Sequence, residues 1–353
     1  MSNMGKAEQG VRPERAALEE KWQQIQAHFS EANFLQSPAW QKMNELVGHK
    51  VIIDANDDTW CLMIVKDAKR GRYLEVPGGP LVDWGNEEQV RRVFGRIRET
   101  AKREKCVFVR LRPQLERSAE NEVRLEALGA RKAPMHLHAE HTVIIDLTES
   151  EEQLLKNMRK QTRYEVRRAE KLGIKVEWGN GEELFREFHA VQAETAARQK
   201  FVPPDLKTLL AEREAFGENA RIYVARTAEG EAVAYGLVLI DGIEAEYFEA
   251  ASTELNRKIP GAYALQWQVM RDLKALDVRR YNLWGIAPLK VTGGKGRHVV
   301  ADSRHRYAGV TTFKTGFGGE VIEYVPAQDI VIKRMRYGVN WLIEAIRKKK
   351  RHL

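Results

Sequence analysis

The chain has 353 residues, more than one hydrophobic core usually supports, so two domains of roughly 150 residues each are expected. Hydrophobic residues at 43%, charged residues at 31% and a net charge of +8 are typical of a globular protein with an anionic partner, such as RNA, phosphate or a membrane surface. The polar N-terminus has no signal core, and no apolar run approaches the roughly 20 residues that span a bilayer, so we expect a cytoplasmic protein.

The first half of the chain predicts a mixture of helices and antiparallel strands. Residues 1–13 are expected to form a disordered tail, and apolar residues recur at helical spacing over 14–32. Further helices are predicted near 87–104 and 119–129. Strands are predicted for the apolar runs KVIIDA, TWCLMIVKD, GRYLEVPGGPLVDW, CVFVRLRP and HTVIIDL. The two cysteines, Cys61 and Cys106, lie in such runs, which favours buried reduced thiols over a nucleophile or a disulfide.

The second half repeats this pattern. One long helix is predicted over 150–172, with others near 181–197 and 204–216 and a further helix after Pro260-Gly261. Strands are predicted for IKVEW, RIYVARTA, EAVAYGLVLIDG, IEAEYFEAAS and VRRYNLWG, and an alternating, strand-like run leads through VTTFKT to a C-terminal helix. The order favours two successive α+β units with mostly antiparallel sheets over one doubly wound parallel sheet.

The predicted helix over 150–172 carries a strongly basic face. Apolar residues step by three or four along one side, and five cations step the same way along another: Lys156, Lys160, Arg163, Arg167 and Lys171. Such a stripe can follow a phosphate backbone, but an ordinary solvated helix face has the same composition. The C-terminal helix ends in RKKKRHL, which suits a helix dipole and could also attract an anionic leaflet or RNA.

Three other features leave ligand binding open. The helix start at 258–262 could bind an anion or be a plain Pro-Gly start signal. The basic, glycine-rich loop at 289–306 lacks the P-loop pattern and is either a mobile closing loop or a surface loop. His136, His138 and His141 have no neighbouring cysteine or carboxylate set, so we expect no metal site.

Several of these stretches, in their order, resemble motifs of the Fem family of aminoacyl-tRNA-dependent transferases, which build peptidoglycan cross-bridges. The resemblance covers about 34–326. It rests on FLQSPAW, VPGGPLVD, DLTESEEQLLKNMRKQTRYEVRRAEKLGIKV, IPGAYALQW, YNLWGI and YAGVTTFKTGFGG.

The resemblance implies an α+β fold of two tandem acetyltransferase-like (GNAT-like) domains, without the coiled-coil insertion of FemA-type members. We expect the first domain over 14–147 and 320–353, because the family's last segment returns to it, and the second over 148–319. The implied activity is transfer of an amino acid from aminoacyl-tRNA to an amine on the stem peptide of a UDP- or lipid-linked muramyl-peptide precursor. No cofactor is expected, and the enzyme is expected to be a monomer with peripheral contact to the inner membrane surface.

The resemblance also implies roles for particular residues. Lys314 is expected to stabilise the oxyanion, Phe313 to wall the site, and Asp83 to accept the proton of the attacking amine. Precursor-binding candidates are Trp40, Lys42, Arg257, Tyr263 and Glu320, with Glu320 also a second candidate base. The tRNA-binding candidates are Arg159, Lys160, Arg163, Arg167, Lys295 and Arg297. Gly316, Gly318 and Gly319 are expected to let the tRNA end approach the backbone closely.

Two positions depart from the family pattern. Asn44 stands where the family usually has a lysine that binds diphosphate, and the turn at 77–80 reads Pro-Gly-Gly-Pro without the usual arginine. Both changes remove cations from the expected precursor site. An acyl-CoA-dependent N-acyltransferase and a non-catalytic tRNA-binding protein on the same scaffold remain as alternatives.

Overall fold

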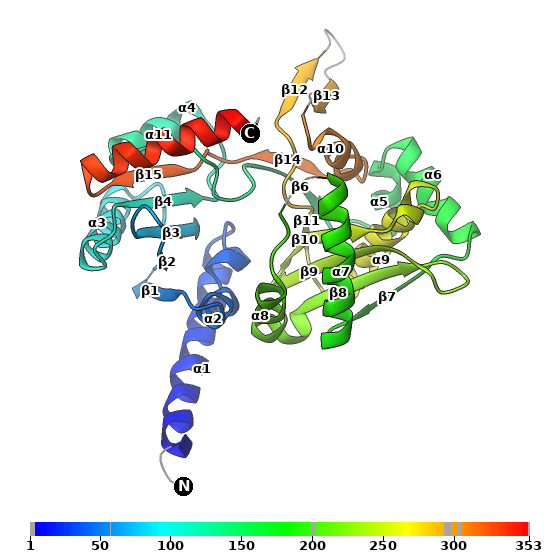
Figure 1. Ribbon diagram of the computed structural model, residues 1–353, viewed down its shortest axis with the longest axis horizontal. Helices are drawn as coiled ribbons and strands as arrows, with labels where there is room; N and C mark the ends of the chain where they lie inside the picture. Colours follow the sequence, from blue (N-terminus) through cyan, green and yellow to red (C-terminus); the bar gives the residue numbers. More distant parts are fainter. Residues whose placement is uncertain (1–3, 57, 200–201, 293–297, 302–304, 352–353) are drawn as a thin grey trace. The chain divides into compact units, whose positions relative to one another are not determined.

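The computed structural model describes residues 4–56, 58–199, 202–292, 298–301 and 305–351, which form two compact units (Figure 1). The first unit comprises residues 1–138 and 324–353, and the second comprises residues 139–323. The elements of the first unit are α1 (Met4–His28), η1 (Phe34–Gln36), α2 (Pro38–Leu46), β1 (Lys50–Asn56), β2 (Thr59–Lys66), β3 (Tyr73–Gly78), α3 (Glu87–Arg103), β4 (Phe108–Pro113), α4 (Ala119–Ala127), β5 (Ala130–Lys132), β15 (Gln328–Val331) and α11 (Arg334–Arg351).

The first unit is built on a six-stranded sheet in the order β1-β2-β3-β4-β15-β5. Only the β3–β4 pair is parallel among its strand pairs in the described residues. The apolar run of β2 is buried from Thr59 to Val65, as its uninterrupted hydrophobic sequence predicts. Strand β15 lies between β4 and β5, so the last segment of the chain completes this sheet. Cys61 and Cys106 are buried free thiols, which confirms the prediction from their apolar surroundings.

The second unit has the longer sheet. Its elements are β6 (His141–Asp146), α5 (Glu151–Asn157), α6 (Lys160–Lys171), β7 (Lys175–Gly179), α7 (Glu182–Gln199), α8 (Leu206–Phe216), η2 (Gly217–Asn219), β8 (Ala220–Arg226), β9 (Ala232–Asp241), β10 (Glu244–Ser252), η3 (Glu254–Arg257), α9 (Gly261–Ala275), β11 (Arg280–Asn282), β12 (Leu289–Thr292), β13 (His298–Ala301), α10 (Ala308–Thr315) and β14 (Glu320–Glu323). Strands β12 and β13 form a separate pair. The other strands make a seven-stranded sheet in the order β14-β6-β11-β10-β9-β8-β7.

In this second sheet β10 and β11 are parallel, and a bulge interrupts β10 between Tyr247 and Glu249. Helices α6 and α9 contribute Val166 and Leu265 to a core that includes Tyr247. Strands β14 and β6 pair with each other, so 139–147 and 320–323 belong to this unit and not to the first, where the sequence placed them. Pairing between distant strands, which no local pattern encodes, decides this boundary.

Several elements differ from the sequence prediction, among them the strands β5, β14 and β15, which it did not include. Helix α1 begins at Met4, ahead of the predicted start at 14. The long helix predicted over 150–172 is divided into α5 and α6, because Met158 and Arg159 are extended, with ψ of 148° and 146°, and the Arg159 N–H donates to the Gly316 carbonyl at 2.8 Å. This hydrogen bond from the Arg159 N–H to a distant turn thus takes the place of a hydrogen bond within the helix.

The strand-like run at 307–315 is a helix, α10. Its alternation covers only a few residues, and its threonines are accommodated within the helix. The hydroxyls of Thr311 and Thr315 donate to the Tyr307 and Thr311 carbonyls, each at 2.8 Å. Threonine is satisfied in a helix in this way, so its strand propensity does not decide the conformation here.

Candidate active site

Lys314 lies in the last turn of α10 and is only 8% exposed. Its Nζ donates to the Gly285 carbonyl at 2.9 Å and lies 5.9 Å from the centre of the Tyr247 ring. Among the described residues Lys314 forms no ion pair with a carboxylate. The ammonium therefore has one carbonyl and one ring face as its polar surroundings.

Burial lowers the pKa of Lys314 to about 7. Removing an ammonium from water without a carboxylate to compensate disfavours its charged form. An anion placed beside Nζ would supply the missing charge and raise the pKa again. Such a perturbed, incompletely satisfied cation is typical of a functional site.

An aromatic group packs around the end of α10. The Phe313 ring lies 5.1 Å from the Tyr263 ring and 5.0 Å from the Phe317 ring, between ring centres. Tyr263 and Phe317 are themselves 5.8 Å apart, and burial raises the pKa of Tyr263. The structure thus brings together three residues from two predicted motifs, Lys314, Phe313 and Tyr263. The roles assigned to them from sequence stay predictions.

The glycines after Lys314 serve the packing of the protein itself. A Cβ at Gly319 would lie 2.5 Å from the Ile144 carbonyl oxygen, and one at Gly318 would lie 3.0 Å from that of Asn157. Both residues have positive φ, +87° for Gly318 and +86° for Gly319. Packing against β6 and α5 is thus sufficient reason for glycine at positions 318 and 319. The expectation that the glycines let a tRNA end approach the backbone stays a prediction.

Two of the predicted tRNA-binding arginines are engaged by backbone carbonyls of the same unit. Arg159 Nη2 donates to the Thr312 carbonyl of α10 at 2.6 Å, and Arg163 Nη1 donates to the Lys156 carbonyl of α5 at 2.9 Å. These bonds satisfy carbonyls near helix C-termini, which have no partner within the helix. Lys160 and Arg167 are exposed on α6. Lys295 and Arg297 lie outside the described residues.

In the first unit, the two predicted precursor-binding motifs contact each other. Asn33 Nδ2 donates to the Gly78 carbonyl at 2.9 Å, and Gln36 Nε2 donates to the Pro77 carbonyl at 2.6 Å. A Cβ at Gly78 would lie 2.2 Å from Asn33 Oδ1, and one at Gly79 would lie 2.6 Å from the Gln36 side chain. A side chain at either glycine would require Asn33 or Gln36 to move, and Gly78 also has a positive φ of +64°, which favours glycine.

A lysine that sequence reasoning missed lies next to Asn44. Lys66, the last residue of β2, places Nζ 3.2 Å from Asn44 Oδ1, and Asn44 Nδ2 donates to the Trp40 carbonyl at 3.0 Å. Trp40 is 7% exposed, and Lys42 is half-buried. The loss of a lysine at position 44 therefore leaves a cation in place, supplied by the neighbouring strand. The only sequence signal is that a cation ends the buried run TWCLMIV.

Further charges surround Lys66. Burial lowers its pKa, while the nearby Glu75 carboxylate raises it. Burial raises the pKa of Glu75, which Lys66 opposes. Burial, together with the nearby Arg112 and Lys66 cations, lowers the pKa of His138 to about 3. Lys66 and Arg112 thus both lie close enough to His138 to affect its pKa. Cations are rarely buried in an apolar core, so their presence together marks this region as unusual.

The remaining predicted residues lie at the surface. Asp83 Oδ1 accepts from the Gly85 N–H at 2.8 Å and the Asp83 N–H donates to Gln89 Oε1 at 2.8 Å, so the residue shapes the start of α3. Arg257 pairs with Glu254 at 3.2 Å, and Glu320 is exposed at the start of β14. Asp83 belongs to the first unit and Glu320 to the second. Their proposed roles as bases stay predictions.

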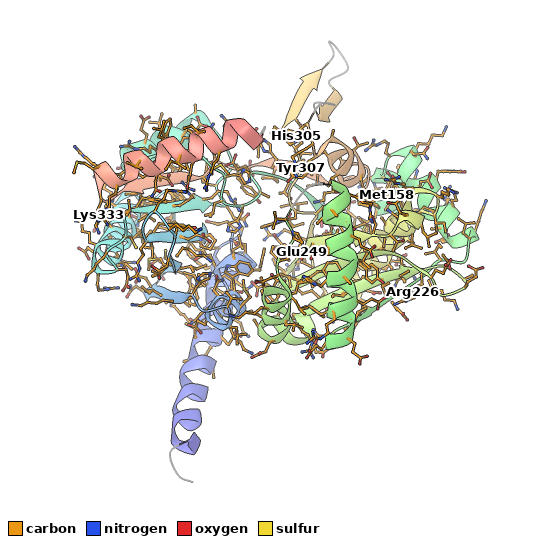
Figure 2. The ribbon with its side chains drawn as sticks, in the orientation of Figure 1. Met158, Arg226, Glu249, His305, Tyr307 and Lys333 are labelled. Atoms are coloured by element: carbon orange, nitrogen blue, oxygen red, sulfur yellow. The ribbon has the colours of Figure 1, made fainter. Side chains whose placement is uncertain are left out.

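A pair of acidic side chains in the second unit also escaped sequence reasoning. Glu249 of β10 accepts from Gln192 Nε2 of α7 at 2.7 Å and lies beside that helix in Figure 2. Burial raises the pKa of Glu249 to about 7, and burial and the Glu249 charge raise that of Glu212 on α8. The pattern EAEYFEAAS, with glutamates inside a predicted strand, was the available signal.

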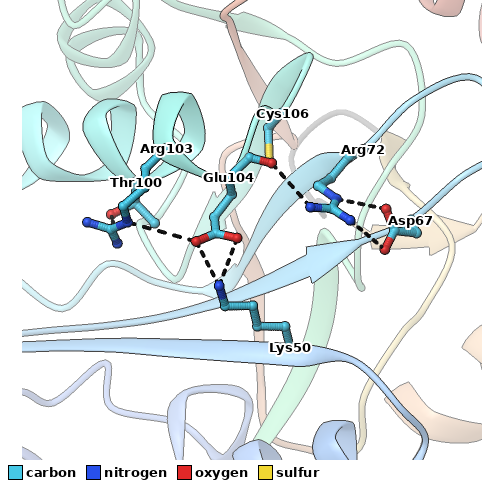
Figure 3. Close-up of polar contacts among 7 residues, drawn as sticks. All are labelled: Lys50, Asp67, Arg72, Thr100, Arg103, Glu104 and Cys106. Atoms are coloured by element: carbon cyan, nitrogen blue, oxygen red, sulfur yellow. Dashed lines mark hydrogen bonds and ion pairs between the residues drawn. The ribbon is translucent and has the colours of Figure 1, made fainter.

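One cavity of about 330 Å³ lies in the first unit, lined by Val47, Gly48, His49, Lys50, Val65, Asp67 and Arg72. Its two long cations are already paired, Lys50 with Glu104 and Arg72 with Asp67, each at 2.8 Å (Figure 3). These pairs neutralise the lining, so the cavity is a weaker anion site than the surroundings of Lys66. Within the described residues, no group of histidine, cysteine or acidic side chains is arranged to hold a metal ion.

Comparisons of sequence and of structure both relate this chain to Fem proteins. A sequence model of the FemAB family matches residues 19–229 and 226–345. Aminoacyltransferase FemA of Staphylococcus epidermidis is 24% identical over 388 residues, covering 85% of this chain and 90% of its own, and FemA of Staphylococcus aureus MRSA252 is 21% identical, covering 72% and 78%. A crystal structure of FemX superposes with a TM-score of 0.75 at 17% identity, covering 91% of this chain and 98% of its own. These similarities confirm the predicted α+β fold of tandem GNAT-like domains.

Proposed function

Because the chain belongs to the FemAB family and is an aminoacyltransferase, we propose that it joins an amino acid from aminoacyl-tRNA to an amino group of a peptidoglycan-precursor stem peptide. The reaction is direct aminolysis of the aminoacyl ester, without a cofactor. The observation that carries this proposal is the buried Lys314 ammonium, which has a carbonyl and a ring face but no carboxylate around it in the described part of the second unit.

The reaction needs little covalent chemistry from the protein. The acceptor amine attacks the ester carbonyl, the C–N bond forms, and the C–O bond to the tRNA ribose breaks. The amine loses a proton and the ribose oxygen takes one up. The ester is already activated, so positioning the two substrates supplies much of the acceleration.

In this mechanism Lys314 stabilises the negative charge that develops on the carbonyl oxygen. Loss of one such donor costs about 2.7–4 kcal/mol of transition-state free energy in other enzymes. A lysine buried without a carboxylate is suited to this role, because no resident anion competes with the oxyanion. The aromatic side chains of Phe313 and Tyr263 would exclude water from the ester.

For the acceptor, we propose that the first unit binds the diphosphate of a UDP- or lipid-linked muramyl peptide with Lys66. Asn44, which bonds the carbonyl of the buried Trp40, holds the Lys66 Nζ in place. Little side-chain entropy is therefore lost when this ammonium contacts a phosphate oxygen. Desolvation lowers the pKa of Lys66 and so disfavours its charged form. A bound anion would stabilise the charged ammonium and raise this pKa again.

The direct test is an assay with purified protein, charged tRNA and a muramyl-pentapeptide acceptor, followed by mass spectrometry of the product. We expect acceptor mass to increase by the aminoacyl residue. Absence of product, while FemX yields product under the same conditions, would refute the proposal. Product from an acyl-CoA donor, or tRNA binding that ignores aminoacylation, would indicate an N-acyltransferase or a non-catalytic tRNA-binding protein instead.

A further inference from the structure

The C-terminal helix α11 is attached to the first unit through the buried ring of Tyr337, which packs against Phe108, and through polar groups. Tyr337 Oη donates to Asp329 Oδ2 at 3.0 Å, and Asn340 Oδ1 accepts from Arg70 Nε at 2.8 Å. One turn further on, Glu344 Oε2 accepts from Arg110 Nη2 at 2.8 Å. Positions 337, 340 and 344 are separated by three and four residues, so the face of α11 that holds the helix in place is its polar one.

The opposite face of α11 is apolar and exposed. Its members are separated by four, three and four residues and therefore form one stripe along the helix. The exposed fractions are 90% for Met335, 59% for Val339, 57% for Leu342 and 49% for Ile346. This is the reverse of an ordinary surface helix, which buries its apolar stripe and exposes its polar one. A continuous exposed stripe of this kind marks a surface that meets an apolar partner.

Cations flank the stripe on both sides. At about 100° per residue, Arg336 and Arg347 fall on one side of the stripe, and Arg334 and Lys348 fall on the other. The sequence of α11 holds seven lysines and arginines and one acidic residue, Glu344, which is already bonded to Arg110. The surface of α11 therefore combines an apolar centre with cationic margins.

We propose that α11 docks on an anionic lipid surface, with the stripe of Met335, Val339, Leu342 and Ile346 entering the boundary between headgroups and acyl chains. The flanking arginines and lysines would contact lipid phosphates, and Trp341, 43% exposed, would lie at headgroup level. None of the described helices is long and apolar enough to cross a bilayer, so the helix lies on the surface.

The combination of charge and apolar area selects this partner over two others. RNA would meet the cations but leave the apolar stripe in water. A second copy of the chain, joined stripe to stripe, would bring two sets of like-charged margins together, which is unfavourable. An anionic membrane satisfies both parts of the surface at once.

Co-sedimentation with vesicles tests the proposal on the full-length protein. Wild-type protein should bind vesicles of equal parts phosphatidylglycerol and phosphatidylcholine at least about tenfold more tightly than pure phosphatidylcholine vesicles. The double variant Leu342→Glu/Ile346→Glu should lose most of this binding, roughly tenfold or more, because it places charge in the stripe. Both side chains are exposed, so its thermal unfolding should match that of the wild type.

The matched control is Leu276→Glu in the second unit, whose side chain is 46% exposed, similar to Ile346. It should bind vesicles like the wild type, and so should Lys314→Met, which separates membrane docking from catalysis. The proposal is overturned if the double variant binds as well as the wild type. It is also overturned if binding ignores lipid charge, or if sedimentation shows a dimer that the double variant dissociates.

Discussion

The half-buried Lys66 of the first unit and the buried Lys314 of the second differ in their partners. Lys66 in the first unit bonds Asn44 Oδ1 at 3.2 Å and has the Glu75 carboxylate nearby, which partly restores its pKa. Lys314 in the second unit bonds the Gly285 carbonyl and faces the Tyr247 ring, and its pKa falls to about 7. Burial acts on both lysines, but among the described residues a compensating carboxylate lies near Lys66 and not near Lys314.

We expect this difference in partners to separate a binding lysine from a catalytic one. A lysine with a side-chain amide and a carboxylate at hand keeps its charge and its position, which suits the binding of a stable anion such as a diphosphate. A lysine without them gains most when negative charge appears during the reaction. Lys66 should therefore affect the affinity for the acceptor, and Lys314 should affect turnover.

The largest expected effect is that of Lys314→Met on turnover. We expect kcat to fall by a factor of about 10² to 10³, because the loss of one oxyanion donor costs about 2.7–4 kcal/mol. Steady-state kinetics with charged tRNA and excess acceptor measure this loss. Affinity for uncharged tRNA, measured in parallel, should change little. Equal losses in turnover and affinity would reduce Lys314 to a binding residue.

The same substitution should have a pH-dependent effect on stability. The folded-state pKa of Lys314 is about 7, far below the usual value of 10.5 for a lysine in the unfolded chain. Between these values the unfolded state binds a proton that the folded state does not, so the wild type becomes more stable as pH rises. Relative to Lys314→Met, we expect its free energy of unfolding to rise by roughly 2 kcal/mol from pH 7 to pH 9.

Urea unfolding of the two proteins at both pH values measures this difference. Lys160→Met removes an exposed lysine of the same unit and is the matched control. Its stability relative to the wild type should not vary over this range, because its ammonium is in water in both states. If the free energy of unfolding of Lys314→Met changes with pH in the same way as that of the wild type, Lys314 is not an uncompensated buried ammonium.

Lys66→Met should raise KM for the muramyl-peptide acceptor by about tenfold, because one charge-assisted contact to phosphate contributes roughly 1.5–3 kcal/mol. The value of kcat should change much less. Lys42→Met provides the comparison with the lysine that the sequence suggested. If Lys42→Met has the larger effect on KM, the assignment of Lys66 is wrong.

The smallest effects are expected on α6. Lys160→Ala and Arg167→Ala should each lower tRNA affinity a few-fold and reduce the slope of log affinity against log salt by about 0.7–0.9. Arg163→Ala should instead lower the free energy of unfolding by about 1–3 kcal/mol, because it leaves carbonyls of α5 without their donor. If the slope of log affinity against log salt falls only for Arg163→Ala, then Arg163 binds tRNA and Lys160 and Arg167 do not.

Much of the fold follows from local patterns. Uninterrupted apolar runs predicted β2 and β4. The alternating pattern at 307–315 wrongly predicted a strand, because the threonine hydroxyls donate hydrogen bonds to backbone carbonyls within α10. The stripe predicted over 150–172 was correct for α6, but the helix break at Met158 depends on a carbonyl from residue 316.

By itself, the sequence determined the family, the fold class and the position of Lys314 next to Phe313, because motif order and hydrophobic periodicity are properties of the chain alone. Only the tertiary structure decided which cations remain available to a ligand. Arg159 meets a carbonyl 153 residues away and Lys66 meets an amide 22 residues away. Burial, and with it the lowered pKa of Lys314, likewise depends on residues such as Gly285 and Tyr247 that packing alone brings close.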